Sequence, residues 1–162
     1  MKKTDKKIFI NYGIIAFLFV FGTAVDLVLK EVFTDKYQTL IDGVISIFYT
    51  ENTGAGFSLF SDATTFLIVL TSILFIVLVS IAIFCKPTTK TYSFGMGFVL
   101  AGALGNLIDR FAFGFVRDFI HLDFMEFPVF NVADVLLTIG VGLLVISVFF
   151  QAEKVGPKEG EK

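Results

Sequence analysis

Residues 63–85 read ATTFLIVLTSILFIVLVSIAIFC and contain no charged side chain. The hydrocarbon core of a bilayer is about 30 Å thick and needs about 20 helical residues, so this stretch is long enough to cross it. Backbone polar groups cannot stay unpaired in lipid, and the stretch is apolar on all sides without strand alternation, so we predict a helix and not a barrel strand. The stretch indicates an integral membrane protein.

Three further runs without Asp, Glu, Lys or Arg lie at residues 8–25, 91–108 and 135–152. We therefore predict an α-helical integral membrane protein with four transmembrane helices. The predicted spans are about 8–29, 64–85, 91–109 and 133–151, within a single domain of residues 1–152. Residues 153–162 are rich in Lys, Glu and Gly, and we expect them to form a disordered cytoplasmic tail.

The composition excludes several other classes of protein. The chain of 162 residues is 56% apolar and only 17% charged, whereas a soluble domain carries about 25% charged residues. A net charge of −2 offers no electrostatic basis for binding nucleic acid. One Cys and one His exclude an internal disulfide and a zinc shell of about three or four such ligands, and we expect no metal or cofactor.

The distribution of charge predicts the orientation in the membrane. The two termini and the loop around residues 86–90 hold nine lysines against four acidic residues, while the opposite side holds four cations against eleven acidic residues. Because Lys and Arg accumulate on the cytoplasmic side, both termini are expected inside. The lysines before residue 8 resemble the start of a secretory signal, but this apolar run exceeds the usual ~7–15 residues, so we expect an uncleaved helix.

Two segments then face outward, residues 30–62 and 110–133. Residues 39–49 alternate with period two around a turn at Asp42-Gly43, which predicts a small extracytoplasmic β-containing cap on the membrane surface. Phe57, Leu59 and Phe60 are expected to dip into the interface. The second segment is rich in Phe and carries Pro128, and we expect a loop with one short helix.

Polar residues gather at the outer ends of the predicted spans. Asp26 and Lys30 lie four residues apart and share a helix face, either as a plain ion pair or as part of a site. In the third span Gly97, Ala101 and Gly105 form a small-residue seam for close helix packing. Gly102, Gly105, Asn106 and Asp109 fall on one stripe, and Asn106, Asp109 and Arg110 exceed what packing requires.

Two aspartates are the candidates for chemistry. Asp134 begins the fourth span beside Asn131, where an acid could merely complement the helix dipole. Asp118 precedes it by sixteen residues, enough for the chain to fold back and bring the carboxylates together. One protonated and one ionised carboxylate activating a water is aspartic-protease chemistry. Ser58 lacks the second glycine of a nucleophile elbow. We interpret Cys85 as a small apolar residue and the lone His121 as a loop residue without a catalytic role.

These residues occur in blocks that resemble the lipoprotein signal peptidase family (signal peptidase II, prolipoprotein signal peptidase). The blocks are Asp26 to Lys30 (Asp-x-x-x-Lys), Asn52 to Ser58 (Asn-x-Gly-Ala-x-Phe), Ala101 to Arg110 (Gly-Asn-x-x-Asp-Arg), Val116 to Phe119, and Phe127 to Asp134. The resemblance covers the chain apart from its two tails. It departs from the family pattern at Leu27, where Gln is common, and at Arg117, where an apolar residue is common, and the stretch between Asp118 and Asp134 looks short.

The resemblance implies a bacterial membrane aspartic endopeptidase with Asp118 and Asp134 as the catalytic pair. It implies supporting or substrate-binding roles for Asp26, Lys30, Asn52, Gly54, Asn106, Asp109, Arg110, Asn131 and Ala133. The implied substrates are prolipoproteins, cleaved before a diacylglyceryl-modified cysteine at the outer face of the cytoplasmic membrane, without metal or cofactor and with inhibition by globomycin. We expect a monomer whose partners are these substrates and membrane lipids.

Further hypotheses follow from the residues themselves. A cation at Arg117 would favour the ionised form of Asp118, and Arg110 would pair with Asp109 or another acid. A small transporter or an assembly factor would also use intramembrane acids and a glycine seam. Against a transporter, the acids gather at one surface, and the chain shows no inverted repeat.

Overall fold

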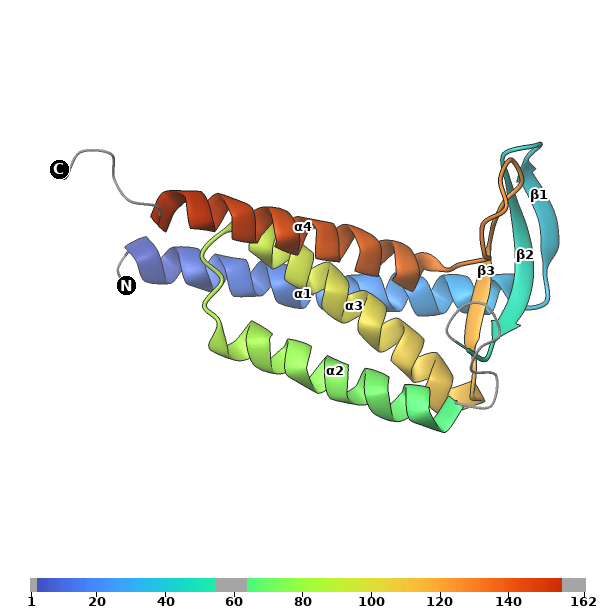
Figure 1. Cartoon of the computed structure of the whole chain (residues 1–162), viewed down its shortest axis with the longest axis horizontal. Coiled ribbons are helices and arrows are strands. Elements are labelled where there is room, and N and C mark those ends of the chain that lie inside the picture. Colours follow the sequence, from blue (N-terminus) through green and yellow to red (C-terminus); the bar gives the residue numbers. More distant parts are fainter. Residues whose placement is uncertain (1–2, 55–63, 156–162) are drawn as a thin grey trace.

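The computed structural model describes residues 3–54 and 64–155 of the chain. In chain order the elements are α1 (Lys3–Phe33), β1 (Tyr37–Ile41), β2 (Ile45–Asn52), α2 (Thr64–Phe84), α3 (Lys90–Phe113), β3 (Val116–Leu122) and α4 (Val132–Val155). All four helices are long and apolar enough to span a membrane, as predicted from their hydropathy. Both described ends of the chain lie at one end of the bundle, and the strands lie at the other (Figure 1).

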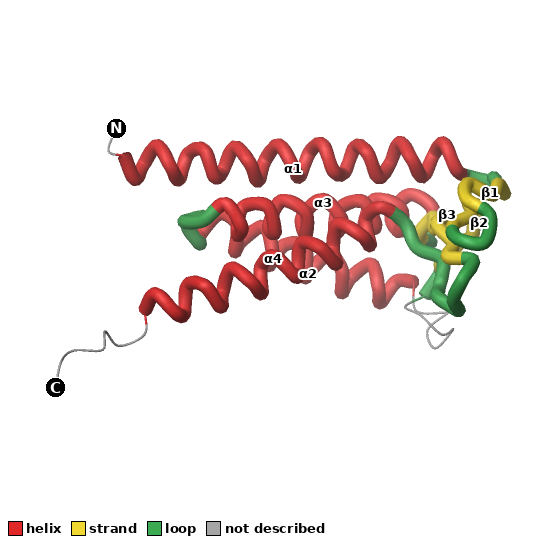
Figure 2. Tube along the Cα trace, turned by 90° about the horizontal axis from the view of Figure 1, so that it is seen from above, coloured by secondary structure: helices red, strands yellow, loops and turns green. Residues whose placement is uncertain are grey.

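Helix α3 lies at the centre of the bundle and packs against α1, α2 and α4 (Figure 2). It begins at Thr89, whose hydroxyl accepts a hydrogen bond from the backbone N–H of Tyr92. It ends at Gly114, which has a φ of 82° and donates its N–H to the carbonyl of Arg110. This left-handed glycine ends the helix and lets the chain turn directly into β3.

The glycine seam of α3 is confirmed. A Cβ at Gly97 would lie 2.8 Å from the Cβ of Leu18 in α1, and one at Gly105 would overlap the carboxylate of Asp26. On the α4 side, a Cβ at Gly95 would lie 2.9 Å from the carbonyl oxygen of Gly140. The missing side chains therefore let α3 approach both neighbours closely.

Gly102 faces the start of α4, and its replacement tests this packing. A Cβ there would overlap the carbonyl oxygen of Ala133 and lie 2.8 Å from Cγ of Leu137. We expect Gly102→Ala to lower the free energy of unfolding by about 1–3 kcal/mol, because overpacking must displace α4. Thermal unfolding in detergent measures the change.

Gly142→Ala is the matched control, because nothing lies within 4 Å of a Cβ at that position of α4. It should leave the melting temperature unchanged or slightly raised, since Ala favours helix more than Gly does. Equal melting temperatures for the two variants would contradict the packing described for Gly102.

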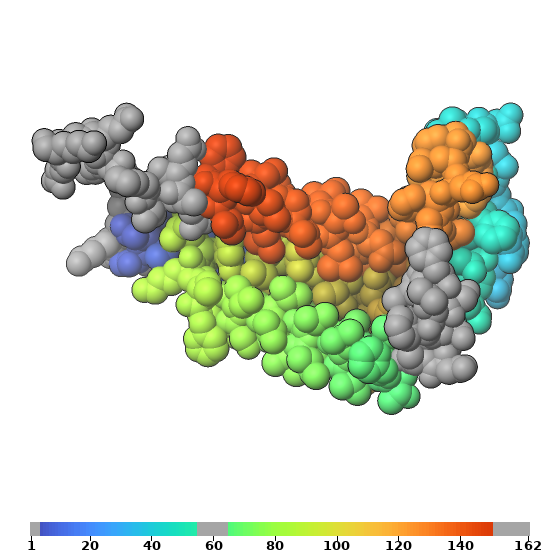
Figure 3. All heavy atoms as spheres, viewed as in Figure 1, coloured from blue at the N-terminus to red at the C-terminus, as the bar shows by residue number. Residues whose placement is uncertain are grey.

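The strands form one antiparallel sheet in the order β1-β2-β3. The predicted hairpin is confirmed, since Gly43 has a φ of 67° and Val44 donates its N–H to the carbonyl of Ile41. We refer to the sheet with the following loop, residues 123–131, as the cap. The cap stands out sideways beyond the helices, so that the molecule is hollowed where the cap meets α4 (Figure 3).

The prediction of a short helix between residues 110 and 133 is wrong. Apart from the last turn of α3 and the first turn of α4, this described segment holds β3 and a loop. Strand β3 pairs with β2, with Thr50 opposite Asp118 and Glu51 opposite Arg117. The strand satisfies backbone groups along an edge of β2, a requirement that the local sequence does not reveal.

Candidate active site

Asp134 occupies the first turn of α4 and is locked there by Asn131. The side-chain oxygen of Asn131 accepts the backbone N–H of Asp134 at 3.0 Å, and Oδ2 of Asp134 accepts the backbone N–H of Asn131 at 3.2 Å. This reciprocal arrangement is a capping box, which satisfies donors that a helix start leaves unpaired. It also points the Asp134 carboxylate out of the end of the helix.

Asp118 lies in the middle of β3, is 1% exposed, and is held by two amides. Its Oδ2 accepts Nδ2 of Asn52 in β2 at 2.9 Å, and its Oδ1 accepts Nδ2 of Asn131. Gly54 donates its N–H to the side-chain oxygen of Asn52 at 3.2 Å and so turns the amide nitrogen toward Asp118. Asn52 and Gly54 thus act on Asp118 from β2 and the residues just after it.

Burial raises the pKa of Asp118 to about 6. The hydrogen bonds from Asn52 and Asn131 and the charge of Lys30 act in the opposite direction, while the nearby charge of Asp134 raises the pKa further. The carboxyl of Asp118 therefore changes protonation near neutral pH, which is the range useful for acid–base chemistry.

Asn106 of α3 binds Asp134 directly and is linked to Asp118 through Asn131. Its Nδ2 donates to Oδ1 of Asp134 at 2.8 Å, and its Oδ1 accepts Nδ2 of Asn131 at 3.1 Å. The same oxygen accepts Nζ of Lys30 at 2.9 Å. Asn106 and Asn131 therefore connect Asp118 and Asp134 through hydrogen bonds.

Asp26 and Lys30 form a fully buried ion pair at 2.8 Å. Lys30 also lies 3.4 Å from Oδ2 of Asp109. Oδ1 of Asp26 accepts the backbone N–H of Ala133 at 2.8 Å and so ties α1 to the start of α4. The pair is thus both a structural ion pair and a support for the residues around Asp134.

Arg117 makes no ion pair with Asp118, so the predicted effect of its charge on the ionisation of Asp118 stays a prediction. Neighbouring residues of a strand point to opposite faces, and the guanidinium of Arg117 binds Asp109 and Glu31. The proposed pairing of Arg110 with an acid is also not found, because within residues 3–54 and 64–155 its side chain makes no ion pair. Nη1 of Arg110 instead lies 3.5 Å from the carbonyl of Asn106.

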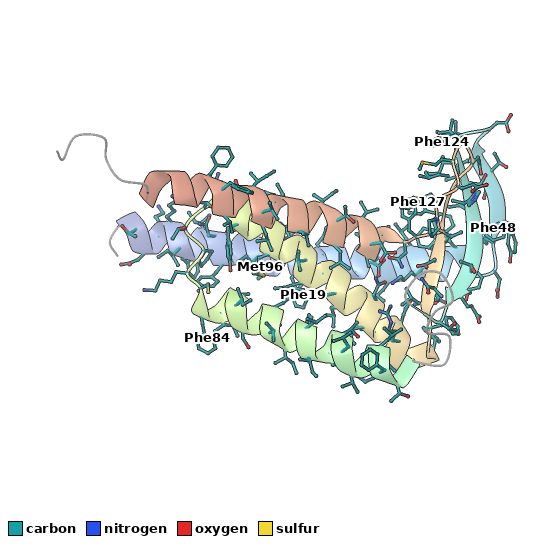
Figure 4. The ribbon with its side chains drawn as sticks, viewed as in Figure 1. Phe19, Phe48, Phe84, Met96, Phe124 and Phe127 are labelled. Atoms are coloured by element: carbon teal, nitrogen blue, oxygen red, sulfur yellow. The ribbon has the colours of Figure 1, made fainter. Side chains whose placement is uncertain are left out.

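Two cavities meet at Asp134. The larger, about 510 Å³, lies between the cap and α4 and includes both Asp118 and Asp134 in its wall. The remaining lining residues are Asn52, Leu122, Phe127, Pro128, Val129, Phe130, Val135, Thr138 and Ile139. Phe127 lies closer to the helices than Phe124, which is at the tip of the cap (Figure 4).

The smaller cavity, about 320 Å³, lies among α2, α3 and α4. Asn106, Arg110 and Asp134 are its polar residues besides Thr71, and Leu74, Phe75, Leu78, Ala103 and Leu137 are among its apolar ones. The sequence alone did not identify these cavity walls. One available signal was helical spacing, which places Asp134, Val135, Thr138 and Ile139 on one face of α4.

Other candidates from the sequence lie apart from this site or outside the described part. Nδ1 of His121 lies 3.0 Å from Asp123 on the cap, and Cys85 is exposed at the opposite end of the bundle. Ser58, Phe57, Leu59 and Phe60 fall within residues 55–63, outside the described residues. In the described ranges no group of three or more His, Cys, Asp or Glu could hold a metal ion.

Comparison with known proteins places the chain among membrane peptidases. A family model described as signal peptidase (SPase) II matches residues 14–150. The lipoprotein signal peptidase of Enterococcus faecalis is 37% identical over 135 residues, which cover 83% of each chain. That of Microcystis aeruginosa is 38% identical over 136 residues, covering 80% of this chain and 88% of its own.

Solved structures agree with this match. A bacterial membrane enzyme solved by the in meso method at 2.3 Å resolution has a TM-score of 0.81 and 31% identity, covering 92% of this chain and 95% of its own. A second, at 1.9 Å resolution, has a TM-score of 0.76 and 33% identity, covering 84% and 92%.

Proposed function

Because the chain belongs to the signal peptidase II family of membrane aspartic peptidases, which process prolipoproteins, we propose that Asp118 and Asp134 are its catalytic pair. The observation that supports this most directly is that two carboxylates from different elements line one cavity. Each has both oxygens held by N–H donors, from Asn52 and Asn131 for Asp118 and from Asn106 and Asn131 for Asp134.

The proposed reaction is hydrolysis of a peptide bond by a water held between the two carboxylates. One aspartate, as general base, takes a proton from the water while the water oxygen bonds to the scissile carbonyl carbon. The other, protonated, donates to the carbonyl oxygen, and proton transfer to the leaving amine accompanies cleavage of the C–N bond. Burial of Asp118 favours proton uptake on its carboxyl.

The remaining residues of the site have supporting roles in this proposal. Asn106 and Asn131 hold the carboxylates, and Asn52 with Gly54 holds Asp118 from the cap. Asp26, Lys30, Asp109 and Ala133 hold the ends of α1, α3 and α4 together beneath the site. Arg110 faces the smaller cavity and offers a cation to a polar group of the substrate.

We further propose that the substrate carries a diacylglyceryl-modified cysteine and reaches the site sideways from the bilayer. The supporting observation is that Asp134 borders a cavity that continues along apolar side chains of α2, α3 and α4. Both cavities are largely apolar around a few polar groups, as suits a lipid-bearing peptide. The acyl chains would stay in the membrane while the peptide bond lies at the carboxylates.

The charge distribution supports an orientation with both termini in the cytoplasm and the cap at the outer face. The candidate carboxylates then lie near the outer surface, where a secreted precursor is presented. We propose that the chain acts as a monomer, since the described residues of one copy form the whole carboxylate site. The comparisons do not support the transporter alternative.

The test of this function is cleavage of a matched pair of precursors by the purified protein. One precursor carries the diacylglyceryl cysteine, and the other has the same sequence without the lipid. We expect cleavage only of the lipidated precursor, immediately before the cysteine as read by mass spectrometry, and inhibition by globomycin. Equal cleavage of both precursors would contradict the proposed lipid requirement.

A further inference from the structure

Arg117 lies in β3 and is a buried cation that forms ion pairs with residues of two helices, α1 and α3. Only 6% of the residue is exposed. Its Nη2 lies 2.8 Å and its Nε 3.3 Å from Oδ1 of Asp109 in α3, while Nη1 lies 2.9 Å from Oε2 of Glu31 in α1. The guanidinium also lies 4.5 Å from the centre of the Phe113 ring. These contacts hold the side chain in one geometry.

Arg117 lies on the face of β3 that attaches the strand to the helices. Its backbone N–H donates to Oδ2 of Asp109 at 2.9 Å, so one carboxylate binds both the backbone and the side chain of the same residue. Two positions along, the ring of Phe119 packs on Phe33 of α1 with centroids 5.0 Å apart. Asp118, between them, points to the opposite face toward Asn52 and Asn131. The position of Asp118 therefore depends on what Arg117 binds.

Arg117 also balances the buried charge beneath the carboxylate site. Asp26 and Asp109 are fully buried anions, and Lys30 contacts both. Without Arg117, Lys30 would be the only cation among the described residues that forms an ion pair with these two carboxylates. Lys30 also donates to Asn106, which in turn donates to Asp134. Arg117 thus leaves Lys30 available to hold Asn106.

Resting on the catalytic pair proposed above, we propose that Arg117 is a positioning residue of this peptidase. It fixes the strand that carries Asp118, and by neutralising Asp109 it keeps Lys30 on the amide that holds Asp134. It acts through these groups and does not touch the reacting atoms. The role rests on the contacts that the Arg117 side chain makes in this chain.

The charged groups around the carboxylates of Asp118 and Asp134 determine how activity is expected to depend on pH. They are Asp26, Lys30 and Glu31 on α1, Glu51 on β2, Asp109 and Arg110 on α3, and Arg117 on β3. Arg117→Met leaves Asp109 one positive charge short, which adds a buried negative charge near the carboxylates. A like charge disfavours ionisation, so the acidic limb of kcat/KM should move to higher pH.

The experiment compares Arg117→Met, Arg117→Lys and a control, Lys36→Met, on the lipidated precursor. Lys36 is an exposed cation just before β1. For Arg117→Met we expect kcat to fall about 10- to 100-fold with KM within about twofold, and the acidic limb to rise by about one pH unit. Arg117→Lys keeps the positive charge but loses the planar guanidinium with its several N–H donors. The acidic limb of the pH profile should therefore stay in place, with a smaller loss of kcat. Lys36→Met should match the unmodified protein.

A double variant separates positioning from mere folding. Asp109→Asn with Arg117→Met restores the balance of buried charge, so the acidic limb should return toward its original pH although kcat stays low. If Arg117→Met does not fold, the lower kcat expected for Arg117→Lys still gives the readout. An unchanged kcat and limb per folded molecule in the Arg117 variants would overturn the proposal. Failure of the catalytic pair is seen separately, as cleavage that persists without Asp118 or Asp134.

Discussion

Asp118→Asn and Asp134→Asn should each lower kcat by about 10³-fold or more, because a general acid or base is removed from a pair that acts as a unit. Asparagine has nearly the shape of aspartate but neither takes up nor delivers the proton. Its side chain has the same size, so the protein should stay folded and membrane-inserted, although the new NH2 faces an N–H donor that the carboxylate had accepted. Single-turnover cleavage of a lipidated precursor measures the effect.

Asp42→Asn provides the matched control for these substitutions. Asp42 is an exposed acid in the β1–β2 turn of the same cap, outside the carboxylate site. The control should cleave at the normal rate. Near-normal processing by either Asp118→Asn or Asp134→Asn would rule out the catalytic pair, whatever the result for the control.

Lys30→Met should cause a large loss of stability. Lys30 is 0% exposed and lies 2.8 Å from Asp26 and 3.4 Å from Asp109, so its removal leaves two buried carboxylates with one cation, Arg117, on only one of them. Breaking a buried ion pair in this way costs about 3–5 kcal/mol. We expect a much lower melting temperature in detergent and little active protein at 37 °C.

Two further variants serve as comparisons for Lys30→Met. Lys36→Met removes an exposed lysine and should leave the melting temperature unchanged. Asp26→Asn should be milder than Lys30→Met, because an amide oxygen can still accept the N–H of Ala133 and no buried anion is left over. A melting temperature for Lys30→Met equal to that of Lys36→Met would mean that the buried network contributes little to stability.

The hydropathy of the chain was sufficient to predict the four helices and their approximate bounds. The differences lie at helix ends: α1 begins already at Lys3 and extends to Phe33, and α3 extends to Phe113. Charged residues occupy these ends, so an uncharged run underestimates a helix that leaves the hydrocarbon. The β1–β2 hairpin was also predictable, because alternation and the Asp42-Gly43 turn are local signals.

Strand β3 was not predictable from local pattern. Its partner strand β2 lies far away in the sequence, and the consecutive charges of Arg117 and Asp118 obscure the alternation. The same strand geometry explains why Arg117 does not contact Asp118. Adjacent in sequence, the two side chains point to opposite faces, toward Asp109 and toward Asn131 respectively.

The sequence by itself determined the membrane class, the number of spans and which polar residues gather at one end of the bundle, because these follow from hydropathy and helical periodicity. Only the tertiary structure decided how those residues are connected. Asn106 links Lys30 to Asp134, and Asn131 links Asp118 to Asp134, through hydrogen bonds between elements distant in sequence. Such bonds depend on angles and distances of about 3 Å that helix crossing and strand register set, and no local pattern specifies either.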